Sequence, residues 1–226
     1  VNRMIASVGQ IDSYKLQTGN MLEKDWQRYN EALSQLSETN IFIEDNVSVT
    51  AQDIRAKCRR LANSETGLGL VVIDYLQLIN SGSRRVESRQ VEVSEISRAL
   101  KTMAVELDVP VIALAQLSRS AEKRESNQPM LSDLRESGSL EQDADMVLFI
   151  NRKDYYEKAK DFNNKIVPAE LIIAKHRKGG LGTVNLLFEL NMLSFKSVLK
   201  VNGDENQRYN YNFNFIYNNC YFIYSK

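Results

Sequence analysis

An apolar run that ends in a carboxylate is the clearest chemical feature of the sequence. Residues 70–73 read Leu-Val-Val-Ile, and Asp74 follows them. A buried strand of this kind delivers its last side chain to the carboxyl edge of a sheet, where α/β proteins bind ligands. There a carboxylate can hold Mg²⁺ through water while the metal neutralises nucleotide phosphates. Many α/β folds place an aspartate at a strand end without a nucleotide, so the pattern alone leaves both interpretations open.

Gln116 follows a second apolar run, residues 111–115, in the same way. A neutral amide at that edge can contact a γ-phosphate or its attacking water. The alternative is a glutamine that hydrogen-bonds backbone at a strand end, and spacing alone favours this alternative. A shared edge for Asp74 and Gln116 is therefore a hypothesis.

A basic cluster, Lys175-His176-Arg177-Lys178, ends another apolar segment and precedes two glycines. A guanidinium beside a lysine can stabilise charge on a transferring phosphoryl group, within one subunit or across a subunit boundary. A hairpin with a solvated basic tip is the commoner source of such a cluster. His176 is interpreted as a surface histidine, because the sequence has no second histidine and no paired cysteines to complete a metal site.

A polar loop carries candidates for binding phosphate. It holds, in order, Arg135, Glu136, Ser137 and Gly138. Backbone amides beside a glycine can approach phosphate closely, and the arginine adds charge. A plain connecting loop is an equally good interpretation on spacing alone. A second polar loop, from Asn80 to Gln90, contains Arg85 and Arg89.

Composition excludes several classes of protein. The chain has 226 residues, 43% hydrophobic and 26% charged, with 29 basic and 29 acidic side chains. These proportions are ordinary for a folded domain. No apolar run approaches the roughly 20 residues of a membrane span, so we expect no membrane partner. Two cysteines cannot form a disulfide framework, which favours a reducing, cytoplasmic location. Because acidic and basic side chains are equal in number, a polyanionic partner would have to bind a local basic patch.

The helices that position these residues are predicted by apolar periodicity. Apolar residues recur at helical spacing from Leu22 to Leu36 and from Val93 to Leu107. Thr50 and Asp53 mark the start of a further helix, whose exposed face carries four basic residues. We interpret that basic face as solvated, with a binding patch as the alternative. Leu140 to Ala144 predicts a short helix.

The strands are predicted by continuous apolar runs. Residues 70–74, 111–115 and 146–150 predict strands that are buried on both faces, as in a parallel sheet. A strand, a helix and a strand in this order imply a right-handed parallel crossover. Residues 171–174 and 184–188 predict a hairpin, and residues 41–43 a short strand.

The last 23 residues, Asp204 to Lys226, differ in composition from the rest. They contain six Asn, three Phe and five of the ten Tyr in the chain. A surface on which nucleic-acid bases stack is one interpretation. A disordered or weakly β-prone tail that belongs to no fold is the interpretation we favour.

Several segments together resemble one protein family. They are Ile54–Arg60, Val72–Leu78, Arg89–Arg98, Val109–Arg119, Asp133–Asp145 and Ile173–Gly179. From about Val1 to about Val198 the chain is similar to the C-terminal ATPase domain of bacterial replicative DNA helicases of the DnaB type. The resemblance implies an α/β fold, a RecA-like P-loop ATPase core whose central, mostly parallel sheet is flanked by helices. We expect a partial domain of this kind over 1–199 and a disordered tail over 200–226.

The resemblance also implies an activity and its cofactors. ATP and Mg²⁺ would drive movement along single-stranded DNA and duplex unwinding during replication. In this comparison Asp74 would be the magnesium-associated acid and Gln116 the γ-phosphate sensor. Lys175 and Arg177 would act on the nucleotide of the neighbouring subunit, with Arg177 as the arginine finger.

Partners follow from the same resemblance. The protein would form a homohexameric ring around single-stranded DNA. The loop of Arg135, Glu136, Ser137 and Gly138 would line the central channel, with Arg85 and Arg89 as weaker DNA-binding candidates. Primase and a helicase loader are the other expected partners.

Two parts of the family's ATPase are missing from the 226 residues. No Gly-x-x-x-x-Gly-Lys-[Ser/Thr] loop occurs, and the catalytic glutamate that the resemblance places before Val1 is absent. We therefore expect that the chain alone does not hydrolyse ATP and that an apolar edge of its sheet is left uncovered.

Two other interpretations stay open. The first is a truncated, non-catalytic module that binds helicase subunits, a helicase loader or single-stranded DNA. The second is a recombinase of the RecA-like group, which would lack the match over Asp133–Asp145.

Overall fold

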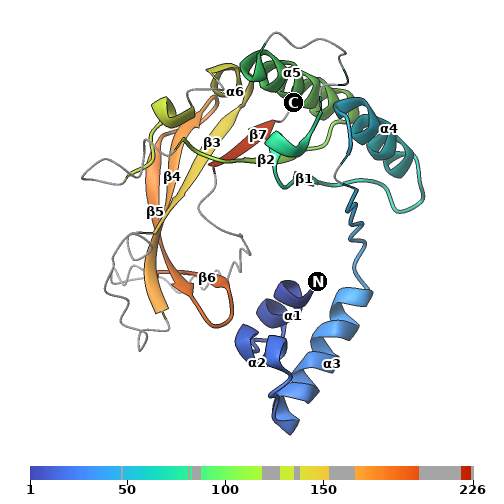
Figure 1. Ribbon diagram of the computed structural model, residues 1–226, viewed down its shortest axis with the longest axis vertical. Helices are drawn as coiled ribbons and strands as arrows, with labels where there is room; N and C mark the ends of the chain where they lie inside the picture. Colours follow the sequence, from blue (N-terminus) through green and yellow to red (C-terminus); the bar gives the residue numbers. More distant parts are fainter. Residues whose placement is uncertain are drawn as a thin grey trace. The chain divides into compact units, whose positions relative to one another are not determined.

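The computed structural model describes residues 1–46, 48–80, 82, 88–118, 128–134, 138–152, 166–198 and 220–224 (Figure 1). The chain divides into two compact units. Unit 1 comprises Val1–Phe42, Arg152–Glu170 and Val184–Tyr217, and unit 2 comprises Ile43–Asn151, Leu171–Thr183 and Asn218–Lys226. All the candidate site residues belong to unit 2.

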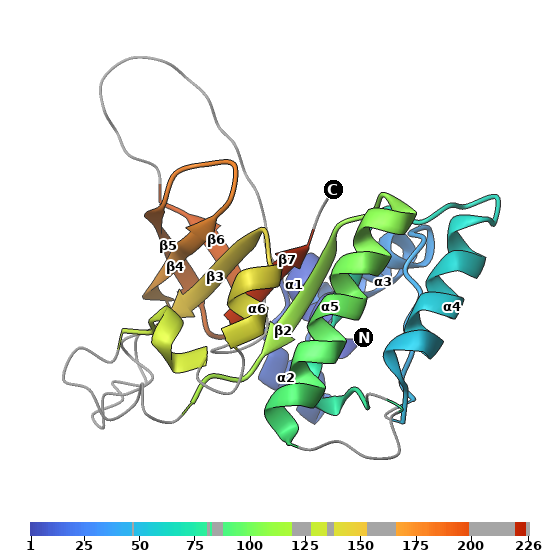
Figure 2. The same ribbon diagram turned by 90° about the horizontal axis from the view of Figure 1, so that it is seen from above.

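Parallel strands form the basis of unit 2. Strand β1 (Val71–Ile73) and strand β2 (Val111–Ala115) are parallel, and Ile73 lies beside Ala113. Helix α5 (Arg89–Leu107) connects them, as the predicted crossover requires. Helix α4 (Ala51–Ala62) contacts α5 and runs beside it (Figure 2).

The third predicted strand, β3 (Met146–Asn151), is separated from β2 by one strand that the sequence did not predict. This is β7 (Cys220–Tyr224), which is antiparallel to both neighbours (Figure 1). Because β7 opposes both of them, β2 and β3 run in the same direction. Residues 220–224 of the segment expected to be a disordered tail over 200–226 thus form a strand, while the rest of that segment lies outside the described residues.

The complete strand order is β1-β2-β7-β3-β4-β5-β6. Strands β4 (Ile166–His176) and β5 (Gly182–Glu189) form the predicted hairpin, and the residues next to its turn belong to unit 2. Strand β6 (Ser194–Ser197) pairs antiparallel with β5 within unit 1.

The core of unit 2 lies between α5 and the sheet. Four large apolar side chains of α5 are at most 2% exposed, namely Val93, Ile96, Leu100 and Met103. They belong to one cluster with residues of β2 and β3, among them Val111, Val147 and Phe149. The α/β fold expected from the sequence is therefore confirmed. No helix in the described ranges is both long and apolar enough to cross a membrane.

Two predictions about strands are wrong. β1 is not buried on both faces: Val71 and Ile73 pack against the core, whereas Val72, on the opposite face, is 59% exposed. Residues 41–43 form no strand; Ile41, Phe42 and Ile43 are between 50% and 65% exposed. Their side chains suit a strand, but no strand in the part of the chain that the structure describes pairs with them. A strand needs such a partner as well as β-prone residues.

Helix α4 begins where the sequence predicts it. The Asp53 N–H donates to Thr50 Oγ1 at 3.2 Å, and the Thr50 N–H donates to Asp53 Oδ2 at 2.9 Å. On the basic face of this helix, Arg55 and Arg59 pair with Glu106 of α5, and Lys57 pairs with Glu44. These ion pairs favour the interpretation of a solvated face over that of a binding patch.

Unit 1 contains three helices in its first 42 residues: α1 (Asn2–Val8), α2 (Ser13–Thr18) and α3 (Glu23–Ser37). The sequence predicted only α3. Asp25, in the first turn of α3, is 5% exposed. It accepts a hydrogen bond from the Leu22 N–H at 3.1 Å and pairs with Lys15 at 3.1 Å. These two contacts hold the pKa of Asp25 below its ordinary value of 3.8.

Asp25→Asn tests this contribution. A carboxyl whose pKa is lower in the folded state stabilises the fold above its unfolded pKa, and this effect is lost as the pH falls through the folded value. We expect the variant to have a lower urea midpoint than the parent at pH 5–7. The difference should shrink below pH 3.8. Glu23→Gln, an exposed position in the same turn, is the matched control. A difference that persists undiminished at acid pH would contradict the assignment.

Candidate functional site

The carboxyl edge of β1 and β2 holds two of the candidate residues. Asp74 directly follows β1, and Gln116 directly follows β2. Because the strands are parallel and in register, both residues leave the sheet at the same edge. Both are exposed. The peptide bond that follows Asp74 is cis. The structure thus brings these two residues to one edge.

Gln77 bridges the two strand ends. It lies in η1 (Leu76–Leu78), the short 3-10 helix after Asp74. Its Nε2 donates to the Gln116 carbonyl at 3.5 Å, and its Oε1 accepts from the Gln116 N–H at 3.5 Å. Both contacts use the Gln116 backbone, so the side-chain amide takes no part in them. No sequence pattern singled out Gln77, although it lies inside the segment Val72–Leu78 that carries the resemblance.

Arg89 reaches the same bridge. It is the first residue of α5, and its Nη2 donates to the Gln77 carbonyl at 2.6 Å. Its Nη1 pairs with Glu92. A residue predicted to contact DNA is therefore joined through Gln77 to the residue predicted to sense the γ-phosphate.

The other DNA-binding candidates are only partly described. Arg85, Arg135, Glu136 and Ser137 lie outside the described residues. Gly138 is exposed and begins helix α6 (Gly138–Asp143). Apart from its chain neighbours and the backbone of its own helix, no atom of the described residues lies within 4 Å of the position that its Cβ would occupy.

Lys175 and Arg177 contact the carboxyl end of α6. Lys175 Nζ donates to the carbonyls of Glu141 and Gln142, and Arg177 Nη2 donates to the Gln142 carbonyl at 3.2 Å. The last carbonyls of a helix have no partner within it, so cations are favourable there. Burial, together with the neighbouring Arg177, lowers the pKa of Lys175.

Asp145 binds two cations at once. Its Oδ1 lies 3.0 Å from Arg177 Nη1, and its Oδ2 lies 2.6 Å from Lys101 Nζ of α5. Its carbonyl also accepts the Arg177 N–H at 2.8 Å. Asp145 directly precedes β3, so this cluster lies at the amino end of that strand.

The four candidates for nucleotide chemistry therefore form two separate pairs. Asp74 and Gln116 lie at the carboxyl edge of the parallel strands. Lys175 and Arg177 lie at the amino edge, because β3 runs in the same direction as β1 and β2. One copy of unit 2 does not bring the two pairs together.

Gly179, in the turn after Arg177, has no room for a side chain. A Cβ on Gly179 would lie 2.2 Å from His176 Cε1, so the imidazole ring occupies the space that a side chain would need. His176 is half-buried against this turn rather than free on the surface. Among the described residues, no group of three or more His, Cys, Asp or Glu could hold a metal ion.

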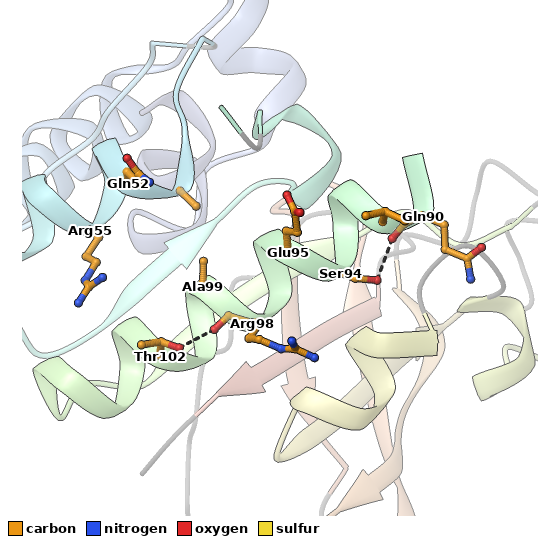
Figure 3. Close-up of a pocket in the computed structure, with 10 residues that line it drawn as sticks. Gln52, Arg55, Gln90, Ser94, Glu95, Arg98, Ala99 and Thr102 are labelled. Atoms are coloured by element: carbon orange, nitrogen blue, oxygen red, sulfur yellow. Dashed lines mark hydrogen bonds between the residues drawn. The ribbon is translucent and has the colours of Figure 1, made fainter. Parts of the chain in front are cut away.

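A groove of about 670 Å³ lies between α4 and α5 (Figure 3). Gln52 and Arg55 line it from α4, while Glu95, Arg98 and Thr102 line it from α5. The described residues around this groove include none of those predicted to bind nucleotide.

Residues 1–197 match the family model of the DnaB-like helicase C terminal domain. The chain belongs to this helicase family. It is 54% identical over 188 residues to the replicative DNA helicase DnaB of Geobacillus stearothermophilus and 53% identical over 188 residues to the replicative DNA helicase DnaC of Bacillus subtilis. Each match covers 83% of this chain and 40% of the relative. The chain thus spans about two fifths of the length of these replicative helicases.

Solved structures of related proteins share the fold. A solved ATPase domain is 42% identical, with a TM-score of 0.79, over 87% of this chain and 69% of that one. A DnaB-like replicative helicase, described with its interactions with primase, is 43% identical with a TM-score of 0.77. That match covers 84% of this chain and 45% of the helicase chain. The RecA-like ATPase core expected from the sequence is therefore confirmed as the fold.

The two ion pairs of Asp145 make a testable contrast. Lys101 and Asp145 are 23% and 18% exposed, whereas Arg177 is 50% exposed. An exposed pair contributes about 1 kcal/mol or less. In double-mutant cycles that combine Asp145→Ala with Lys101→Met or Arg177→Met, urea unfolding should give the larger coupling for Lys101. A larger coupling for Arg177 would show that its contact with Asp145 is the main structural link.

Proposed function

We propose that residues 1–197 are part of the motor domain of a replicative DNA helicase. The whole protein would couple ATP hydrolysis to movement along single-stranded DNA and to duplex unwinding, as a homohexameric ring. The observation that carries this proposal is the separation of the two candidate pairs at opposite edges of one sheet. A subunit arranged in this way can bind a nucleotide with its own Asp74 and Gln116 at the interface with one neighbour, and extend its Lys175 and Arg177 toward the nucleotide of the other neighbour.

The residues at the carboxyl edge suit a magnesium nucleotide. Mg²⁺ in nucleotide sites is held by one or two carboxylates together with phosphates and water. Asp74 agrees with that pattern because its carboxylate is exposed. The described residues contain no cluster of further metal ligands. Bound Mg²⁺ and ATP would supply the transferable phosphoryl group and neutralise part of its charge. Asp74 would orient the metal through water, and the Gln116 amide would contact the γ-phosphate.

Arg177 would stabilise charge on the nucleotide of the neighbouring subunit. A guanidinium has five N–H donors, and the contacts to Asp145 and Gln142 use two of them. The side chain is half exposed, so the other donors can reach a phosphate outside the chain. Lys175, anchored on the carbonyls at the end of α6, would add a second positive charge beside it.

The DNA-binding part of the proposal concerns the two loops. Arg135, Glu136, Ser137 and Gly138 would line the channel, with Arg85 and Arg89 as further contacts. The hydrogen bonds from Arg89 to Gln77 and from Gln77 to Gln116 offer a route by which DNA contact could influence the nucleotide edge. Because a solved relative is described with primase, we also propose primase, and a helicase loader, as partners of the whole protein.

A second candidate is a non-catalytic module that binds helicase subunits, a loader or single-stranded DNA. One observation favours it for these 226 residues taken alone: they contain no Gly-x-x-x-x-Gly-Lys-[Ser/Thr] loop. The two candidates differ in whether residues 1–197 support ATP hydrolysis when the rest of a helicase is supplied.

Mixing two inactive variants tests action between subunits. Residues 1–197 would replace the matching part of the Geobacillus stearothermophilus relative, and this chimera would carry Arg177→Ala or Asp74→Ala. Arg177→Ala should retain ATP binding and lose hydrolysis by on the order of a thousandfold, the usual contribution of an arginine finger. Mixed rings then contain some interfaces with both residues intact, so DNA-stimulated ATPase activity should partly return.

The unmutated chimera is the positive control, and subunit exchange is followed with labelled subunits. If subunits exchange and no activity returns, Arg177 acts within its own subunit or only supports the fold. An inactive unmutated chimera would favour the non-catalytic module.

Nucleotide binding by the 226-residue chain tests the role of the phosphate loop. Without backbone amides that cradle phosphate, we expect no affinity for magnesium-ATP in the micromolar range. Isothermal calorimetry measures it directly, with the chimera as the binding control. Tight binding by the chain alone would mean that the carboxyl edge holds phosphate by a different set of residues.

A further inference from the structure

Arg177 is held by two residues that lie far from it in the sequence. Its Nη1 donates to Asp145 Oδ1 at 3.0 Å, and its Nη2 donates to the Gln142 carbonyl at 3.2 Å. Its backbone N–H donates to the Asp145 carbonyl at 2.8 Å. Asp145 therefore fixes both the main chain and the guanidinium of Arg177.

The ion pair between Asp145 and Arg177 is poorly placed to stabilise the fold. The Arg177 side chain is 50% exposed, and an ion pair in contact with water contributes little to stability. An unrestrained arginine adopts many rotamers, whereas contacts at both Nη atoms restrict them. The result is a side chain that is oriented and yet accessible from outside. This combination suits an arginine that must meet a phosphate of another molecule in one orientation.

Lys101 determines how Asp145 can bind Arg177. A carboxylate without another partner often binds an arginine through both oxygens, which occupies two guanidinium donors. Here Asp145 Oδ2 accepts from Lys101 Nζ at 2.6 Å, and Oδ1 accepts from Arg177. Lys101 and Asp145 are 23% and 18% exposed, so the carboxylate is fixed from the less exposed side of the cluster. Asp145 thus divides its two oxygens between the two cations and leaves other donors of Arg177 available.

We propose that Asp145 is a positioning residue for Arg177. It orients the guanidinium toward a phosphate bound by the neighbouring subunit, and Lys101 orients the carboxylate in turn. This inference rests on the proposed function, in which Arg177 acts on the nucleotide across the subunit interface. Asp145 itself does not touch the nucleotide, so its whole effect on hydrolysis is exerted through Arg177.

The ATPase rate of the chimera with the Geobacillus stearothermophilus relative tests this role. Misplacing a catalytic group by about 1 Å can cost on the order of a hundredfold in rate, so Asp145→Ala should lower kcat by ~10- to 100-fold. The KM for ATP should change little, because an arginine finger acts mainly on charge in the transition state. Asp145→Asn keeps an oxygen that can accept from Arg177, and it should retain more activity than Asp145→Ala.

A double variant shows whether Asp145 acts through Arg177. Asp145→Ala combined with Arg177→Ala should be no slower than Arg177→Ala alone, because the carboxylate then has no guanidinium to orient. Lys101→Met should lower kcat when Arg177 is present and should add no loss to Arg177→Ala. A further ~10-fold loss in either double variant would overturn the proposal, since residues acting through one group are not additive.

Glu106 provides a matched control. It is also a carboxylate of unit 2 that pairs with two cations, but these are Arg55 and Arg59 of α4. Glu106→Ala should leave kcat unchanged, and its urea midpoint should be compared with that of Asp145→Ala. A loss of activity in Glu106→Ala equal to that in Asp145→Ala would overturn the proposal, since any ion pair of this unit would then have the same effect.

Side-chain NMR of the 226-residue chain tests the positioning without ATP hydrolysis. The Nε–H signal of Arg177, identified by its loss in Arg177→Lys, reports fast motion of the guanidinium. Asp145→Ala should increase this motion toward that of flexible groups, and Glu106→Ala should not. Unchanged motion in Asp145→Ala would overturn the proposal whatever the kinetics. Increased motion together with normal hydrolysis by the Arg177→Ala chimera would instead overturn the proposed function, and with it the role of Asp145 in hydrolysis, while confirming the contact.

Discussion

The carboxylate of Asp145 is the interaction on which the arrangement of unit 2 depends. Asp145 lies immediately before β3. Its carboxylate binds both Lys101 of α5 and Arg177, which directly follows β4. A single charged group thereby fixes the crossover helix, the hairpin and a central strand to one another. Neighbouring polar contacts reinforce it: Ser97 Oγ donates to Asp143 at 2.8 Å, and the Ser94 and Ser139 hydroxyls lie 2.7 Å apart. Ser94, Ser97 and Lys101 recur at helical spacing, so one face of α5 carries all three contacts.

Helix α5 thereby connects the two edges of the sheet. Its first residue, Arg89, contacts Gln77 near the carboxyl edge, and Lys101, twelve positions later, contacts Asp145 at the amino edge. A helix of this length is a rigid element, about 1.5 Å long per residue. A change at one edge that shifts α5 would therefore be felt at the other. This mechanical link agrees with a motor in which nucleotide and DNA are bound by different parts of the same subunit.

The sequence predicted those features that depend on local patterns. The start of α4 follows from Thr50 and Asp53, which are three residues apart, and the buried faces of α5, β2 and β3 follow from their own periodicity. The shared edge of Asp74 and Gln116 follows from the directions of two parallel strands. Features that depend on residues far apart in the sequence could not be predicted. Asp145 pairs with Arg177, and Gln77, after β1, bonds to the backbone of Gln116, after β2. The composition of the whole tail does not predict β7, whose structure depends on four β-prone residues, Tyr221 to Tyr224, and on pairing with the distant strands β2 and β3.

The position of β1 at the edge of the sheet bears on how the protein behaves at high concentration. An open edge strand is a template on which another molecule can add a strand, and long, flat, apolar edges lead to aggregation. β1 has only three residues and gives way to the 3-10 helix η1 soon after Asp74. Val72 and the nearby Leu70 are exposed apolar side chains, at 59% and 48%, but the strand is too short to offer another molecule more than a few residues for pairing. The short length of β1 therefore limits self-association at this edge, although the sequence of the strand is apolar enough to promote it.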